Sequence, residues 1–269
     1  MARLKILYFH VDAFAENPFR GNPAGVCLLD SWLPDVTLQH IAAENNLSET
    51  AFVVARDDGR YDLRWFTPTV EVDLCGHATL AAAFVLFGKV VPGAGTVFFH
   101  SRSGELTVVR EGKLLTLIFP SRPAVACDAP EELLRGLRQH PAEVLKARDY
   151  LAVFETEADV ASLCPDFDLL KTLDALGVIA AAPGSDCDFV SRFFAPAAGI
   201  NEDPVTGSAH CTLIPYWAQR LGKRKLNARQ ISRRGGELSC ELSGDSVYIR
   251  GKAVLYLRGE IELKDSAAA

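Results

Sequence analysis

Short runs rich in apolar, β-branched and aromatic residues, one of which alternates with polar residues, recur along the first 120 or so residues and are typical of β-strands. The runs predict strands over residues 6–14, 25–29, 50–55 and 61–66, with several more between residues 96 and 119. Glu111-Gly112 has the composition of a hairpin turn. Two segments with helical features interrupt the strands, a periodic one over residues 38–45 and an Ala- and Leu-rich one over residues 76–87.

The second half continues the mixture of strands and helices. A polar helix is expected over residues 131–148 and another helix over residues 208–220. Strands are expected over residues 150–155, 177–182, 188–195, 238–242, 246–250 and 253–263. Strands therefore outnumber helices, and we expect most neighbouring strands to be antiparallel, in an α+β fold.

One internal similarity suggests how the chain is divided. The sequence RWFTP at residues 64–68 recurs as RFFAP at residues 192–196, and each copy is followed by an acidic stretch and a Gly that opens an Ala-containing helix. Chance similarity between two common strand–loop–helix units is the alternative, but the repeated order favours two pseudo-symmetric domains. Proline and small residues over 120–130 place the boundary, which gives domains 1–122 and 123–269, with the variant that a terminal strand crosses over.

Composition narrows the partners. The chain has 269 residues and a formal charge of −6, without a basic stripe, so nucleic acid is not an expected partner. No apolar run approaches the roughly 18 residues of a membrane span, and the N-terminus has the pattern of a strand rather than a signal peptide. The seven cysteines contain no C-x-x-C pair, which is typical of reduced thiols in the cytoplasm.

The two Gly-opened helices predict a site for an acid. Backbone N–H groups in the first turn of a helix lack partners and attract carboxylates, and Gly allows a ligand to approach them. Gly76 and Gly207 occupy equivalent places in the two halves. If the halves face each other, a small carboxylated substrate is held from both sides.

Glu49 is the strongest candidate for chemistry. It lies between Ser48 and Thr50 at the start of an apolar strand, close to the expected interior. Burial disfavours the charged form of a carboxyl group, and such a group is suited to taking and returning a proton near neutral pH. The alternative is a surface Glu beside a strand. His77 and Asp203 lie near the two helix starts and are candidates for orienting the substrate, or for local capping alone.

The cysteines allow three further interpretations, and each has an argument against it. A two-thiol racemase requires a second Cys in the slot where Cys75 precedes Gly76, but Thr206 fills that slot. A zinc site from Cys75, His77, His210 and Cys211 does not match the usual spacings. A Cys–His hydrolase lacks an identifiable orienting residue. The sequence contains no nucleotide-binding motif, so no cofactor is expected. Two Gly-containing pairs, Gly21-Asn22 and Gly235-Gly236, are interpreted as turns.

These motifs, in this order, resemble those of the phenazine-biosynthesis PhzF family. The resemblance rests on VDAF (11–14), NPFRGNPAGV (17–26), SETAF (48–52), FTP (66–68), CGHAT (75–79), EDPVTGSA (202–209), RRGG (233–236) and GKAV (251–254), which span most of the chain.

The resemblance implies the diaminopimelate epimerase fold, two similar domains that are each a sheet or barrel around a central helix, with the site between them. It also implies a homodimer without cofactor and an isomerase with a single glutamate as acid/base, which matches Glu49. Substrate-binding residues of the family match Gly76, His77, Asp203, Gly207 and Ser208, and Cys75 matches one of the two cysteines of the related epimerases. Many members have unknown substrates, and a shared fold does not transfer a substrate.

Overall fold

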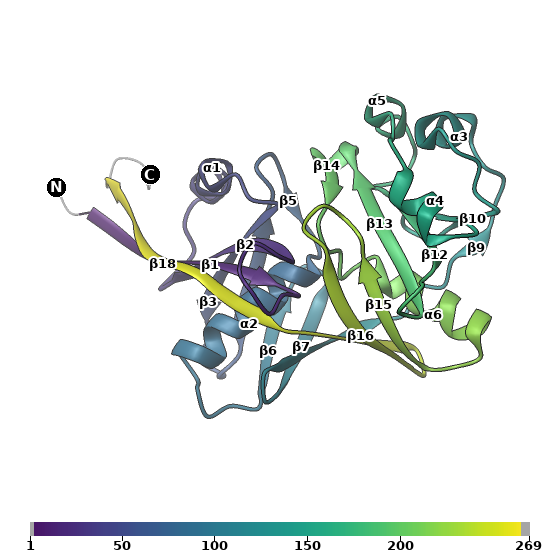
Figure 1. The fold of residues 1–269 in the computed structure, drawn as a ribbon. Helices are drawn as coiled ribbons and strands as arrows, with labels where there is room; N and C mark the ends of the chain where they lie inside the picture. Colours follow the sequence, from purple (N-terminus) through teal and green to yellow (C-terminus); the bar gives the residue numbers. More distant parts are fainter. Residues whose placement is uncertain (1–2, 265–269) are drawn as a thin grey trace. The chain divides into compact units, whose positions relative to one another are not determined.

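In the computed structural model, which describes residues 3–264, the chain divides into two compact units. The first comprises the chain up to Leu117 together with the segment from Gly251 onward, and the second comprises Ile118–Arg250 (Figure 1). The domain bounds predicted from the sequence, 1–122 and 123–269, stay a prediction about which segments fold as domains.

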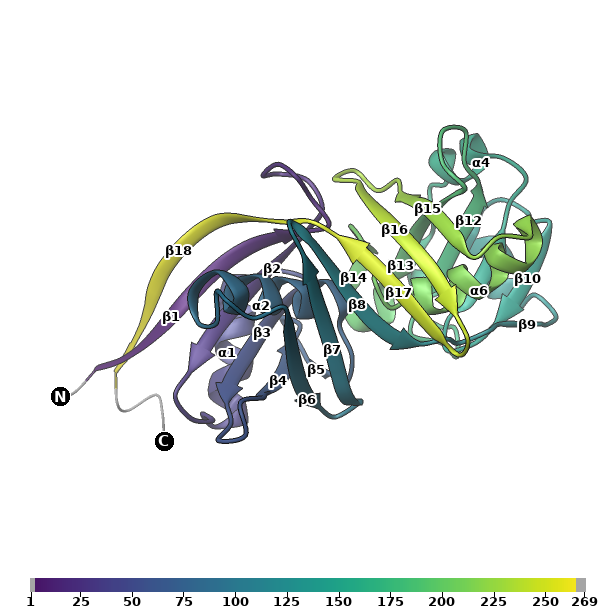
Figure 2. The same cartoon turned by 90° about the horizontal axis from the view of Figure 1, so that it is seen from below.

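The first unit is a mixed sheet wrapped on a helix. Its strands pair in the order β18–β1–β2–β3–β4–β6–β7, with β2–β3 and β4–β6 parallel and the other pairs antiparallel. Figure 2 shows β18 running along β1. Two further strands complete the set, the two-residue β5 beside β4 and the seven-residue β8 after β7. The bounds are β1 Arg3–Ala13, β2 Asn22–Leu29, β3 Glu49–Ala55, β4 Tyr61–Phe66, β5 Glu71–Val72, β6 Thr96–Ser101, β7 Gly104–Glu111, β8 Leu114–Pro120 and β18 Ala253–Lys264.

The helix α2 (Gly76–Lys89) is the centre of this unit. Eleven of its fourteen residues are buried, and it contacts β1, β2, β3 and β6. A helix that is apolar on all sides is stable only inside a core, and its Ala residues let the strands approach closely. The amphipathic helix α1 (Asp35–Asn45) covers the sheet through Leu38, Ile41 and Ala42. The helix predicted over residues 76–87 is confirmed as the buried helix α2.

The second unit repeats the pairing scheme of the first. Its order is β9–β10–β11–β12–β13–β15–β16–β17, with β11–β12 and β13–β15 parallel, the same alternation as in β1–β2–β3–β4–β6–β7. The helix α6 (His210–Leu221) packs on β15 and β16. The remaining bounds are β9 Val125–Ala126, α3 Glu131–Leu137, β10 Glu143–Lys146, β11 Tyr150–Val153, α4 Glu157–Ser162, α5 Phe167–Leu170, β12 Val178–Pro183, β13 Phe189–Ala195, β14 Ile200–Asp203, β15 Lys225–Gln230, β16 Gly236–Ser243 and β17 Ser246–Gly251.

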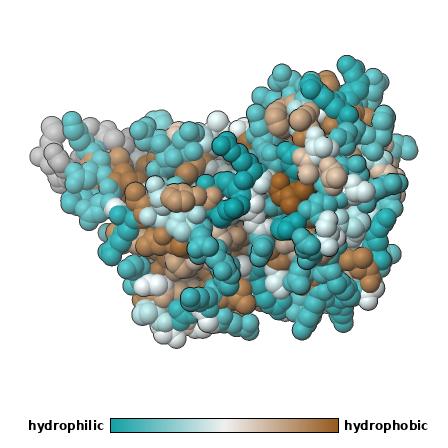
Figure 3. Space-filling model, in the orientation of Figure 1, coloured by the Kyte–Doolittle hydropathy of each residue, from teal (hydrophilic) through white to brown (hydrophobic). Residues whose placement is uncertain are grey.

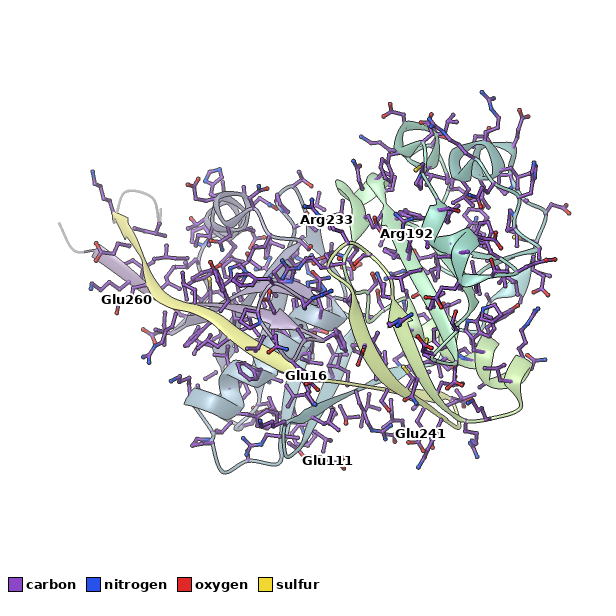
Figure 4. The ribbon with its side chains drawn as sticks, in the orientation of Figure 1. Glu16, Glu111, Arg192, Arg233, Glu241 and Glu260 are labelled. Carbon is purple, nitrogen blue, oxygen red and sulfur yellow. The ribbon has the colours of Figure 1, made fainter. Side chains whose placement is uncertain are left out.

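The repeated RWF and RFF sequences have one structural purpose. Arg64 on β4 donates to both oxygens of Glu71, through Nε at 2.7 Å and Nη2 at 2.8 Å. Arg192, labelled on β13 in Figure 4, forms the same bidentate pair with Glu202, at 2.7 and 2.9 Å. Its Nη1 also donates to the Leu163 carbonyl at 2.8 Å. In each unit the guanidinium therefore anchors the loop that leads toward the central helix.

Two predicted helices need correction, and one strand was not predicted. The helix predicted over 131–148 ends at Leu137, because Arg138 adopts a left-handed conformation (φ 57°) and Pro141 follows; residues 143–146 form β10 instead. The helix predicted from Ser208 begins at His210. The strand β15 was missed, because its mixture of Lys, Arg and Asn has no clear period, and pairing with β13 and β16 decides its conformation.

Hydrophilic side chains cover most of the face drawn in Figure 3, and apolar ones appear between them as smaller patches. Across residues 3–264, every helix is too short or too polar to span a lipid bilayer.

Candidate active site

Glu49 is the first residue of β3, immediately after the short turn that ends α1. Asn46 closes that helix in a left-handed conformation, and β3 then enters the sheet between β2 and β4. The position opposite Glu49 on β2 is Ala24, which leaves room for a longer side chain. Glu49 is 9% exposed, so its side chain is almost entirely removed from bulk water.

His77 lies in the first turn of α2 and provides the nearest polar group to Glu49. Its Nε2 is 3.1 Å from Oε2 of Glu49, and the imidazole is 3% exposed. The other ring nitrogen, Nδ1, lies 3.0 Å from Nδ2 of Asn22. The two ring nitrogens are therefore each occupied, one by the carboxyl group and one by the amide.

The surroundings of His77 control its charge. Burial by itself lowers the pKa of His77. The Cys75 sulfur and the Glu49 carboxyl group together raise this pKa by more than burial lowers it, so the net pKa lies well above 6.5. The protonated imidazole then forms an ion pair with the Glu49 carboxyl group. In the neutral form Nδ1 accepts from Asn22, and in the charged form a half-turn of the amide presents its oxygen to Nδ1–H. Asn22 is able to serve both states.

Cys75 is the residue immediately before α2 and lies on the same cluster. Its sulfur is 3.5 Å from Nδ1 and 4.0 Å from Nε2 of His77, and the residue is 5% exposed. Burial, followed by the nearby Glu49, raises the pKa of Cys75 to about 11. The side chain is therefore a neutral thiol at pH 7, and a neutral thiol is a poor base.

Asn22 is the residue of this cluster that the sequence interpretation missed. Gly21-Asn22 was interpreted as a turn, and a turn is present, since Gly21 has φ +65° and an added Cβ would lie 2.1 Å from the Ala13 carbonyl oxygen. That turn also delivers Asn22, which is 0% exposed, to the imidazole. A polar residue in the apolar segment that starts β2 was the available signal.

In the second unit, Asp203 ends β14 and is 6% exposed. The Thr206 hydroxyl donates to its carboxyl group. Gln230, which the sequence analysis also missed, fixes this loop by accepting from the Thr206 N–H at 2.8 Å and donating to the Asp203 carbonyl at 2.7 Å. Asp203 and Thr206 are thus tied to each other and to β15 by hydrogen bonds.

Gly207 and Ser208 form a turn that leads into α6, not the first turn of the helix itself. The bonds His210 N–H to Gly207 and Cys211 N–H to Ser208, at 3.1 and 3.2 Å, have the tighter i+3 spacing. The Ser208 hydroxyl accepts from Nη2 of Arg148 at 3.3 Å. Arg148, whose position gave no sequence signal, also contacts the buried Asp149 at 3.3 Å.

The two units differ at the position of Glu49. In register, Thr50 opposes Phe66 in the first unit and Val178 opposes the equivalent Phe194 in the second, so Gly177 corresponds to Glu49. A Cβ on Gly177 would lie 2.8 Å from the Phe194 carbonyl oxygen, so no side chain fits there. Of the two equivalent positions, only the first-unit one carries a carboxyl group.

The same three residues of the first unit are able to hold a metal ion. One ligand atom each from Glu49, Cys75 and His77 lies within 4.8 Å of the other two. This set differs from the zinc site considered from the sequence, which combined Cys75 and His77 with His210 and Cys211. In the structure the third ligand is the Glu49 carboxyl group.

Comparison with known proteins supplies independent findings. Residues 11–259 match the model of a family described as phenazine biosynthesis-like protein, PhzC-PhzF. The chain is 55% identical to an uncharacterized isomerase of Pseudomonas aeruginosa over 260 residues, which cover 97% of this chain and 100% of the relative.

Solved structures agree. A PhzF family protein of Enterococcus faecalis superposes with a TM-score of 0.92 at 48% identity, covering 97% of this chain and 100% of that one. A hydroxyproline epimerase of Agrobacterium vitis superposes with a TM-score of 0.61 at 11% identity, covering 98% and 94%, a likeness that shows the fold alone. The α+β fold predicted from the sequence is confirmed.

Proposed function

The chain belongs to the PhzC-PhzF family of phenazine biosynthesis-like proteins, and from that premise we propose that it is a cofactor-independent isomerase in which Glu49 moves a proton between carbon atoms of a small carboxylated metabolite. The observation that carries the proposal is the nearly buried Glu49 carboxyl group, 3.1 Å from the imidazole of His77. A carboxyl group in this setting is excluded from bulk water and has a single oriented partner.

The chemistry follows from the groups at hand. Glu49, as carboxylate, removes a proton from a carbon next to an unsaturated, carboxylated system and returns it to another carbon of the conjugated chain. The ion-pair contact between His77 Nε2 and Oε2 holds the carboxyl group in one direction, so that one oxygen faces the histidine and the other exchanges the proton. Gly76 at the start of α2 offers backbone N–H groups to the substrate carboxylate.

The structure of the cluster supports one acid/base rather than two. The position equivalent to Glu49 in the second unit is Gly177, and the slot equivalent to Cys75 holds Thr206. The Cys75 thiol, with its raised pKa, is neutral at pH 7. These features weigh against an epimerase with two thiols, which is the alternative function. Substrate binding by Asp203, Gly207 and Ser208, the homodimer and the cytoplasmic location remain predictions.

The test is proton exchange from solvent. The protein is incubated in heavy water with a panel of unsaturated cyclic and amino-acid-derived carboxylates, and mass spectrometry detects the compound that takes up deuterium. Glu49→Gln keeps the size of the side chain but removes the base, so we expect uptake to fall to the background level. Glu16→Gln, an exposed residue of the same unit, serves as the matched control and should retain the rate.

Each competing function predicts another outcome. A two-thiol racemase loses activity in Cys75→Ala and in Cys211→Ala and gives a racemised product. A non-catalytic member binds a compound from the panel without deuterium uptake in any variant. Full exchange in Glu49→Gln would refute the proposed role.

A further inference from the structure

The cluster at the start of α2 has a property that acid/base chemistry does not require. Three different ligand types converge in it, a carboxylate oxygen, a sulfur and an imidazole nitrogen, and all three atoms lie within 4.8 Å. Acid/base work needs only Glu49 and a hydrogen-bond donor. The sulfur of Cys75, 4.0 Å from Nε2 of His77, adds a soft ligand that has no part in that work.

We propose that Glu49, Cys75 and His77 form a binding site for a thiophilic divalent cation, Zn²⁺ in particular, and that the bound cation reversibly inhibits the isomerase. The inhibition rests on the proposed function, because the ion would occupy the Glu49 carboxyl group. The binding itself does not depend on that function.

The distances fit such an ion. Zn²⁺ binds nitrogen and oxygen at about 2.0–2.2 Å and sulfur at about 2.3 Å, so the ligand atoms of one tetrahedral site lie about 3–4 Å apart. Oε2 and Nε2 are separated by 3.1 Å, and Nε2 and Sγ by 4.0 Å. All three pairs lie within 4.8 Å, so the carboxyl group and the thiol would have to rotate toward a common centre, with water in the fourth position.

The chemical nature of the ligands selects the cation. Thiolate and imidazole favour zinc and its cobalt substitute, whereas magnesium and calcium prefer oxygen ligands alone. The Asn22 amide, whose Nδ2 lies 3.0 Å from Nδ1 of His77, would turn so that its oxygen accepts from Nδ1–H, the outer hydrogen bond that usually orients a metal-bound imidazole. The ligands are 3–9% exposed, so an ion there would be shielded from competing water.

Binding must release protons. The Cys75 thiol gives up its S–H proton, and His77 gives up the proton on Nε2, both to the buffer. Because protons leave as the cation binds, the affinity for the cation should increase as the pH rises.

The second unit provides an internal control. Thr206, Ser208 and Gly177 stand where Cys75, His77 and Glu49 stand in the first unit. The buried Cys211 on α6 is a thiol with a pKa also near 11, raised mainly by burial, but it lacks the other two ligands. Cys211→Ala is therefore the matched variant for Cys75→Ala, and circular dichroism verifies that both are folded.

The experiment titrates Co²⁺ into the chelator-treated full chain and records the near-ultraviolet charge-transfer band that a thiolate–cobalt bond produces. We expect one equivalent to saturate the band and Zn²⁺ to abolish it by displacement. The band should be lost in Cys75→Ala and kept in Cys211→Ala. His77→Gln should keep a weak band, and Asn22→Ala should bind about 10–100-fold more weakly. No band in the wild type, or a band that survives in Cys75→Ala, overturns the proposal.

The experiments refute the cation site and the proposed isomerase function independently of each other. If Glu49→Gln abolishes deuterium uptake while the wild type shows no cobalt band, only the cation site is refuted. If the band forms but Glu49→Gln still exchanges protons, the cation site stands and the function of Glu49 is refuted. If both hold, added Zn²⁺ should suppress deuterium uptake and a chelator should restore it; uptake unaffected by saturating Zn²⁺ refutes the inhibition.

Discussion

The stability of the second unit should depend on one buried histidine. His210 begins α6 and is 0% exposed; its Nδ1 lies 2.9 Å from the Thr206 carbonyl oxygen, to which Nδ1–H donates. Nε2 has no hydrogen-bond partner among residues 3–264, and the ring packs beside Phe189, with ring centroids 5.9 Å apart. Protonation would place an unpaired charge in this apolar setting.

The size of this loss of stability follows from the pKa of His210 in the folded chain. Burial lowers the pKa of His210 from 6.5 to about 4, against a smaller opposite effect of the Thr206 carbonyl. The unfolded chain binds the proton below about pH 6.5 and the folded chain only below about pH 4, so folding is favoured above 6.5 and loses stability as the pH falls between these values. The loss amounts to about 2 kcal/mol at pH 5 and about 3 kcal/mol at pH 4.

The perturbation that isolates this effect is His210→Asn. The Asn amide reaches the Thr206 carbonyl in place of Nδ1–H but does not titrate. We expect the variant to be less stable than the wild type at pH 8, because the ring leaves a cavity, by about 1–3 kcal/mol. Towards pH 4 this difference should shrink or reverse, since only the wild type loses the histidine contribution.

Urea unfolding at pH 8, 7, 6, 5 and 4 measures the free energy of unfolding, and the fluorescence of Trp217, stacked on Phe189, reports on the same unit. Subtracting the two proteins cancels all other titrating groups. Parallel pH curves for wild type and His210→Asn would refute the reasoning, because they would show that His210 titrates alike in the folded and unfolded chains.

Two further predictions concern the other charged groups. Nuclear magnetic resonance should show His77 as a cation at pH 7, because its pKa is raised, and in Glu49→Gln the titration midpoint should move down toward 6.5; an unchanged midpoint would contradict the Glu49–His77 pairing. Arg192→Lys keeps the charge but loses the bidentate pair with Glu202, so the free energy of unfolding of the second unit in urea should fall by about 1.5–3 kcal/mol. A change below about 0.5 kcal/mol would contradict a stabilising role of this pair.

The local pattern of the sequence determined much of the fold. The strand β4 follows from period-two alternation, β3 from its β-branched and aromatic residues, and α2 from its run of Ala and Leu. The repeated RWF and RFF segments also pointed to two similar units. In the same way, residues 49 and 77 were identified as candidates from the chain alone.

Other features depended on tertiary contacts. A polar segment such as residues 138–148 has no strong period, so pairing of β10 with β11 outweighs its helical propensity. Asn22 and His77 are far apart in the sequence, and only the pairing of β2 with β3 and the packing of α2 bring the amide, the imidazole and the Glu49 carboxyl group together. The sequence by itself determined which residues are able to carry charge and protons, whereas the tertiary structure decided which of them meet, because contact between distant segments depends on the packing of the whole unit.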